Sequence, residues 1–238
     1  MRGWWQEITG LVLPVDCAGC GHPRTELCER CRGLLGGAAS ARRVRPSPEP
    51  PGLPPVWAAG WYGDEVRAVV LAHKERGALG LARPLGTALA AAVQRVGVTG
   101  PLLLVPVPSA RRAVARRGHD AIARMAGAAA RELRRRGVPA RAAAVLRQRS
   151  PVADQSGLTA AGRLANLTGA VVAAGGSAAL LGAAPVVLVD DLMTTGASLT
   201  VAARAVAVAG GQVAGAAVVA GPHDVHPEIH PDEHHRRW

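Results

Sequence analysis

Short apolar runs alternate with amphipathic stretches along most of the 238-residue chain. Residues 101–108, PLLLVPVP, and residues 185–190, PVVLVD, have the length and composition of strands buried on both faces. Between them, Ala, Leu, Ile and Met recur at helical spacing among Arg and Glu. Because apolar strands that alternate with helices are typical of a parallel sheet covered on both faces, we predict an α/β fold. The predicted strands are 56–62, 101–108, 142–146, 169–173, 185–190 and 212–219, and the predicted helices are 64–73, 79–96, 119–136, 158–166 and 197–209.

The patterned region begins after a stretch of different composition. The length of the whole chain corresponds to about one and a half typical domains. Residues 36–55 are rich in Gly, Ala, Ser and Pro without an apolar period, and we interpret them as a linker. They separate a small N-terminal unit, 1–35, from a main domain, 56–220. The tail, 221–238, holds five His, which can bind metal ions, but its Asp, Glu and Pro favour a solvated, mobile segment.

Most of the positive charge lies in one region. The formal net charge is +11, and every basic residue except Lys74 is an Arg. Residues 109–149 hold twelve Arg against two acidic residues, so nearly the whole excess is local. The apolar fraction of 49% excludes a disordered chain, and the absence of Phe predicts an aliphatic core.

All four cysteines lie near the N-terminus, where Cys17, Cys20, Cys28 and Cys31 form two CxxC turns separated by seven residues. Two such turns offer four thiolates for one tetrahedral ion, which predicts a structural zinc site. The alternatives are two disulfides or free thiols. No run reaches 18 apolar residues, and the N-terminus lacks the apolar core of a signal peptide, so we expect a cytoplasmic protein with no membrane span. Thiols stay reduced in that compartment.

The segment VVLVDDLMTTGAS, residues 186–198, carries the most specific chemistry. It predicts a strand, two carboxylates at its carboxyl end, and a small-residue loop that leads into a helix. Ligands of open α/β sheets bind at the carboxyl ends of strands, and a helix N-terminus attracts phosphate. A carboxylate pair beside a phosphate suits a vicinal diol, with Mg²⁺ relieving the negative charge. The candidate residues are Asp190, Asp191, Thr194, Thr195, Gly196, Ala197 and Ser198.

This segment resembles the 5-phosphoribosyl-1-diphosphate (PRPP) signature of type I phosphoribosyltransferases. The four-cysteine knuckle, WYGDEVRAVVLAHKERG, VPVPSARRAVARRGHDAIARMA and RQRSPVADQSGLTAAGRLAN together resemble the ComF family of competence-associated, phosphoribosyltransferase-like proteins. The resemblance extends over roughly residues 17–220. It implies a phosphoribosyltransferase-like sheet with flanking helices, and Mg²⁺-dependent transfer of phosphoribose from PRPP to an unidentified acceptor.

The resemblance also implies individual roles. The two aspartates, Asp190 and Asp191, would hold the ribose hydroxyls, and the loop that follows would hold the 5-phosphate. A mobile loop at residues 147–166 would close over the site and exclude water. Pro108 and Ser109 would face the diphosphate, whereas Lys74, Arg117, Gln155, Arg163 and Asn166 lie at lid or auxiliary positions.

The sequence departs from the family pattern after the first core strand. The family has RGFNQ there, whereas Arg117 and Gly118 are followed here by His119-Asp120-Ala121, so the Asn and Gln amides are missing. Gly162 also replaces an acidic residue that is common before the loop arginine.

The arginines allow several interpretations. Arg111, Arg112, Arg116 and Arg117 follow a strand end, and some of them are expected to serve a diphosphate. Arg131, Arg134, Arg135 and Arg136 end a predicted helix, where cations complement the dipole on a solvated face. The alternative function is a DNA-uptake factor whose arginines bind single-stranded DNA, with a regulatory or vestigial PRPP site.

Overall fold

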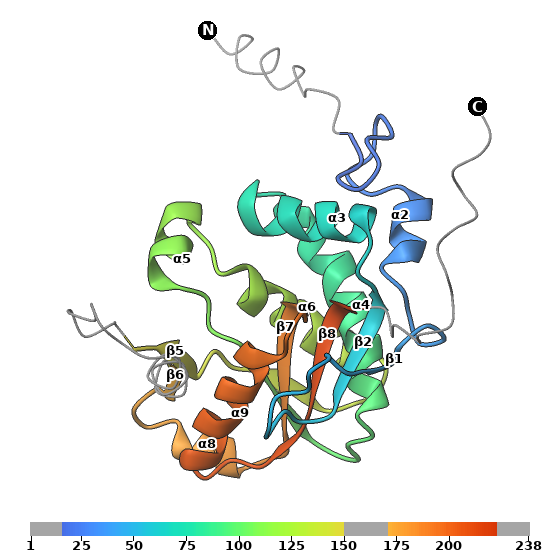
Figure 1. Cartoon of the computed structure of the whole chain (residues 1–238). Helices are drawn as coiled ribbons and strands as arrows, with labels where there is room; N and C mark the ends of the chain where they lie inside the picture. Colours follow the sequence, from blue (N-terminus) through green and yellow to red (C-terminus); the bar gives the residue numbers. More distant parts are fainter. Residues whose placement is uncertain (1–15, 150–170, 223–238) are drawn as a thin grey trace, which may run out of the picture.

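The computed structural model describes residues 16–149 and 171–222. Within them, six strands form one sheet in the order β1-β2-β8-β7-β3-β4, in which only β1 runs antiparallel to its neighbour. A separate antiparallel pair consists of β5 and β6. In Figure 1 the parallel strands run upward, so their carboxyl ends face α3 and α5. The strands are β1 Arg42–Val44, β2 Val56–Trp61, β3 Leu102–Pro106, β4 Ala140–Ala142, β5 Leu146–Gln148, β6 Val171–Ala173, β7 Val186–Leu192 and β8 Val213–Gly221.

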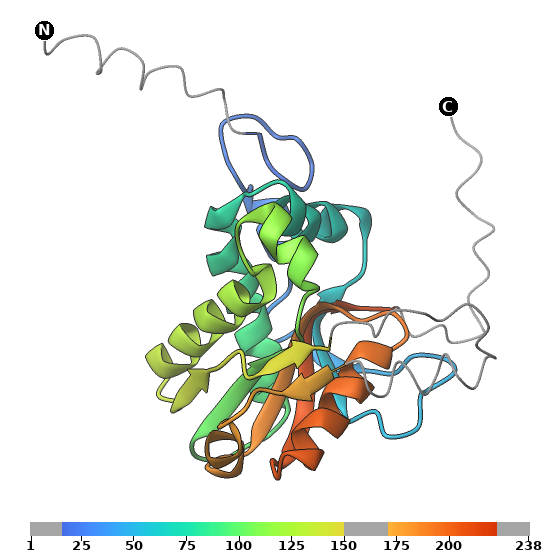
Figure 2. The same ribbon diagram turned by 90° about the vertical axis from the view of Figure 1, so that its left-hand side faces the viewer.

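Helices cover both faces of the sheet, which confirms the predicted α/β class. Figure 2 shows α6 and α9 on opposite sides of the strands. Most of the predicted elements are confirmed, with ends that shift by a few residues. The helices are α2 Glu29–Leu34, α3 Asp64–Glu75, the 3₁₀ turn η2 Leu79–Leu81, α4 Ala82–Arg95, α5 Arg111–Arg117, α6 Ala121–Arg135, α8 Ala178–Gly182 and α9 Ala197–Val208.

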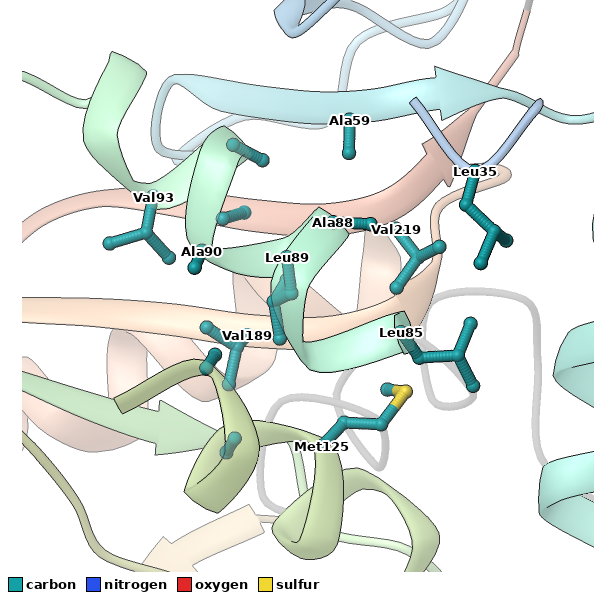
Figure 3. Close-up of a cluster of buried hydrophobic side chains, with 14 of the residues drawn as sticks. Leu35, Ala59, Leu85, Ala88, Leu89, Ala90, Val93, Met125, Val189 and Val219 are labelled. Carbon is teal, nitrogen blue, oxygen red and sulfur yellow. The ribbon is translucent and has the colours of Figure 1, made fainter. Parts of the chain in front are cut away.

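The central strand β7 supplies side chains to two aliphatic clusters. Val187 and Val189 pack with α4 and α6 on one face, whereas Val186 and Leu188 pack with α9 on the other. This alternation follows from the two-residue period of a strand. Figure 3 shows the first cluster, in which Leu, Val, Ala and Met side chains fill the space between α4, α6 and the sheet. The core is aliphatic, as the composition predicts.

The strand order places a crevice beside β7. From β3 the chain crosses through α6 to β4, and from the adjacent β7 it crosses through α9 to β8 on the other side. The crossovers of these two neighbours therefore diverge, which makes the β3–β7 boundary the topological switch point of the sheet. Open α/β sheets bind ligands at this point, outside the carboxyl ends of the strands.

The N-terminal knuckle packs onto the main domain. Cys17, Leu27, Cys31 and Leu35 belong to the same buried cluster as α3 and α4. Gly19 lies so close to Cys31 that a Cβ there would be 2.7 Å from its Sγ atom. The knuckle and the sheet thus share one core.

The predicted linker at residues 36–55 is part of the fold. It contains β1, which pairs with β2, and Val44 is buried in the second cluster. Leu53 contacts Gly196, where a Cβ would be 3.0 Å from both of its methyl groups. The linker interpretation was wrong here because an edge strand of three residues is too short to show an apolar period.

Two further expectations need correction. The predicted strand at 142–146 was wrong: β4 ends at Ala142 and β5 begins at Leu146, because residues 143–145 carry the chain from the main sheet to β5, which pairs with β6 instead. The short helices α5 and α8 were not predicted. No residue of α5 is buried, so it has no apolar stripe to detect. The predicted helix at 158–166 lies outside the described residues.

No helix in the described part of the chain is both long enough and apolar enough to cross a membrane.

Candidate functional site

Two carboxylates occupy the end of β7. Asp190 pairs with Val218 of β8, and both aspartates are more than nine-tenths buried. Asp190 Oδ1 accepts a hydrogen bond of 2.8 Å from the backbone N–H of Asp191. Burial, together with the negative charge of Asp191, raises the pKa of Asp190 well above its usual range. The ionised pair therefore needs nearby positive charge.

Lys74 supplies part of that charge. Its ammonium group lies 2.6 Å from Asp191 Oδ2, although 117 positions separate the two residues in the sequence. Lys74 stands in the last turn of α3, which packs across the carboxyl edge of the sheet. The only lysine of the chain is thus paired with one of the two predicted ligand-binding aspartates.

The loop after β7 forms a small hollow at the N-terminus of α9. Gly196 precedes the helix with a φ of 74°, a left-handed conformation that favours glycine. Gly196 has no side chain to cap the first turn, and the N–H of Ala197 donates only a long hydrogen bond of 3.5 Å to Thr195 Oγ1. The hollow measures about 40 Å³ and is lined by Asp190, Leu192, Met193, Thr194, Thr195, Gly196, Ala197, Ser198 and Leu199. Its chemistry suits a phosphate group.

A second cavity of about 390 Å³ adjoins the first at Asp190, Leu192 and Ser198. It lies at the switch point between the ends of β3 and β7, and α3 and α5 border it. Its lining brings together six residues singled out from the sequence besides Ser198, namely Lys74, Pro108, Ser109, Arg117, Asp190 and Asp191.

Arg117 is the most unusual residue of this cavity. Its side chain is only 4% exposed, and Nη1 donates a hydrogen bond of 2.8 Å to Glu75 Oε1. Its Nε and Nη2 atoms are buried and make no hydrogen bond with any described residue, and the same holds for Ser109 Oγ. Buried polar groups are nearly always hydrogen-bonded, and leaving one unpaired costs about 1–3 kcal/mol. These atoms therefore point to an anionic ligand.

Glu75 holds Arg117 in this position. It accepts hydrogen bonds from Arg117 and from Arg116 Nη2, the latter at 3.2 Å. Burial acts to raise the pKa of Glu75, but the hydrogen bond and charge of Arg117, supported by Arg116, hold it below the usual range. Glu75 thus stays ionised and engages one edge of the guanidinium, which leaves the other N–H groups for a ligand.

The sequence pattern did not predict that Glu75 belongs to this site. Glu75 directly follows Lys74 in the motif AHKERG, and this adjacency was the available signal. The predicted lid residues Gln155, Arg163 and Asn166 lie outside the described residues. The other predicted ligand-binding residues line the two adjoining cavities, except Arg111, Arg112 and Arg116, which line neither.

The four cysteines form a separate cluster that can hold a zinc ion. None is in a disulfide, and their sulfur atoms lie within 4.8 Å of one another. Cys20 Sγ and Cys28 Sγ are 3.6 Å apart, close to the roughly 3.8 Å that tetrahedral zinc with Zn–S bonds of about 2.3 Å requires. Burial acts to raise the pKa of Cys17, but backbone N–H groups, foremost that of Cys20, lower it to about 6. A thiolate is the form that binds zinc.

The arginines at the end of α6 are largely engaged within the protein. Arg134 Nη1 donates to the carbonyl of Ala140 at 2.6 Å. Arg135 and Arg136 both pair with the buried Glu132, at 2.7 and 2.8 Å. These contacts, at a helix C-terminus where cations are favoured, favour the structural interpretation of the cluster.

His73 predicts a pH dependence of stability. Burial lowers its pKa below 6.5, and the charges of His119 and Arg124 act in the same direction, against hydrogen bonds to the carbonyls of Ala78 and Ala121. The unfolded chain then binds more protons than the folded one, so stability is lost as the pH falls below about 6.5. Chemical denaturation between pH 7.5 and 5 measures this loss. His73→Gln is expected to show a shallower slope, whereas an equal slope contradicts the assignment. His22→Gln, at an exposed position, is the matched control.

The fold and site define an α/β protein with a crevice at the switch point of its sheet, where two buried carboxylates, Lys74 and Arg117 meet. The chain matches no protein-family model and no curated protein.

Proposed function

We propose that the chain binds PRPP with Mg²⁺ and transfers its phosphoribosyl group to an acceptor. One observation carries the proposal: anion-binding features flank the carboxylate pair on both sides. The loop before α9 lies on one side, and the unpartnered N–H groups of Arg117 beside Ser109 lie on the other. PRPP carries a phosphate and a diphosphate joined by a ribose with a vicinal diol, which is the same order of groups. The resemblance to the ComF family supports the same ligand.

In this proposal each part of the site has one role. The loop of residues 194–198 binds the 5-phosphate through backbone N–H groups and hydroxyls. Asp190 and Asp191 accept hydrogen bonds from the ribose hydroxyls and are the residues that would hold Mg²⁺. Arg117 and Ser109 donate to the diphosphate.

The reaction is a displacement at C1 of the ribose. The bond between C1 and the diphosphate oxygen breaks, and diphosphate leaves with the bonding electron pair. A nucleophilic atom of the acceptor forms a bond to C1 and gives up a proton. When bound, Mg²⁺ neutralises charge on the leaving diphosphate. Arg117 stabilises the same charge, and Lys74 offsets that of Asp191, so a polyanion meets less repulsion on entering.

Isothermal titration with PRPP and Mg²⁺ tests the proposal. We expect saturable binding by the wild type, and affinity at least about 10-fold weaker for Asp191→Asn, because the variant loses charge-assisted contacts to the diol or the metal. Asp64→Asn changes an exposed aspartate at the start of α3 and should bind as the wild type does. Absence of PRPP binding by the wild type, or equal binding by Asp191→Asn, would overturn the proposal.

Binding of single-stranded DNA was the alternative. Because Arg134, Arg135 and Arg136 have partners within the protein, no observation favours a DNA groove at this end of α6, and we do not propose it.

A further inference from the structure

Two histidines join the end of α3 to the connection between α5 and α6. His119 lies in that connection, and its Nε2 is 3.1 Å from the backbone carbonyl of His73 on α3. In return, His73 Nε2 is 3.3 Å from the carbonyl of Ala121, the first residue of α6. The rings lie 5.9 Å apart and are tilted by 51°. Each of the two segments therefore has a histidine ring that contacts a backbone carbonyl of the other segment.

The carbonyl of His73 is a group that α3 itself leaves unpaired. It belongs to the last turn of α3, which ends at Glu75, so the helix supplies no N–H four residues on. Because a carbonyl only accepts, His119 is the donor and caps this end of the helix. His119 Nδ1 lies 3.0 Å from the carbonyl of Arg117, so the ring lies between two carbonyls, and a neutral imidazole with its single N–H donates to one of them.

The residues next to these contacts carry the anion site. Lys74 and Glu75 directly follow His73, and Arg117 comes two positions before His119. Lys74 reaches Asp191 on β7, and Glu75 reaches Arg117 at the end of α5, both from the turn of α3 that His119 contacts. A shift of this turn by about 1 Å would take both contacts out of the range of good hydrogen-bond distances.

We propose that His119 is a positioning residue of the anion site, which holds Lys74 and Glu75 on α3 in register with Arg117. His119 touches neither the α9 loop nor the aspartates, and it does not line the cavity. Its effect is preorganisation: the cations stand in their binding positions before the ligand enters. The inference rests on the proposed function for its effect on ligand affinity, but the positioning itself is testable without any ligand.

The single lysine gives a direct test of position. Reductive methylation with ¹³C-formaldehyde labels Lys74 and the N-terminal amine, and the dimethyl-lysine signal in NMR reports the ion pair with Asp191. We expect His119→Ala to move this signal toward that of a free, solvated lysine. His119→Gln, whose side-chain amide can donate to the His73 carbonyl, should restore it. His22→Ala, at an exposed position in the knuckle, should leave it unchanged.

Titration with inorganic diphosphate and Mg²⁺ on the full-length chain gives the second readout. We expect affinity about 10-fold weaker for His119→Ala and rescue by His119→Gln. An unmoved Lys74 signal in a folded His119→Ala overturns the inference, even if diphosphate binding weakens, because His119 would then act by another route. If the wild type binds no diphosphate while the Lys74 signal still moves and is rescued, the proposed function fails and the positioning role stands.

Discussion

Replacing Cys31 with serine is expected to abolish zinc binding and to unfold the N-terminal knuckle. Cys31 is almost fully buried, belongs to the shared core, and contributes one of four clustered thiols. Zinc-finger peptides bind zinc with about 10–16 kcal/mol, and this energy orders segments that have little core of their own. Among the described knuckle residues, 16–35, only Cys17, Leu27, Cys31 and Leu35 are buried in the large cluster, so this small set cannot replace the metal.

Elemental analysis and thermal unfolding measure the effect. We expect about one zinc per wild-type chain purified without chelator, and none for Cys31→Ser. The unfolding temperature should fall by several degrees or more, since the knuckle packs on α3 and α4. Cys20→Ser is the informative comparison. Cys20 is exposed, so this variant loses a metal ligand without losing core packing. A well-folded wild type without zinc would contradict the four-thiolate interpretation.

The fold was predictable where the pattern of apolar and polar residues extends over many positions. The apolar run that became β7 and the helical spacing that became α6 set the α/β class, because each spans enough residues to reveal its period. β1 was not predictable by the same means. It is three residues long, and what holds it is tertiary: Val44 is buried, and the guanidinium of Arg42 stacks 3.1 Å above the ring of Trp61. Contacts between distant residues override local composition here.

The site was predictable as a set of residues but not as an arrangement. The segment of β7 and its loop carried a local signal, because a strand, two carboxylates and a helix start are consecutive in the chain. No local sequence pattern predicts the contact of Lys74 with Asp191. The same is true of the buried guanidinium of Arg117, because no residue of α5 is buried when main chain and side chain are taken together. The cause is Glu75 on another helix, which pairs with Arg117 and keeps its guanidinium against the cavity.

We expect the replacement of Arg117 to have a large effect on ligand affinity. Arg117→Met is expected to weaken the binding of PRPP and of inorganic diphosphate by about 100-fold or more. The two unpartnered N–H sites of the guanidinium would each make a charge-assisted hydrogen bond to the ligand, and such bonds contribute about 1.5–3 kcal/mol. Methionine keeps much of the side-chain volume and removes every donor. Glu75 retains Arg116 as a partner in the variant, so it is not left as an unpaired charge.

Two further variants separate ligand binding from general effects of charge. Arg111→Met removes an exposed arginine from the same helix and should bind PRPP as the wild type does. Arg117→Lys keeps the charge but has one donor group in place of the planar fork, so we expect an intermediate loss. Unfolding measurements should show at most a small loss of stability for Arg117→Met, because removal of the buried, unsatisfied N–H groups offsets the loss of the ion pair with Glu75. Equal PRPP affinity of Arg117→Met and Arg111→Met would show that Arg117 is not a ligand for the diphosphate, and the unpaired atoms would then need another explanation.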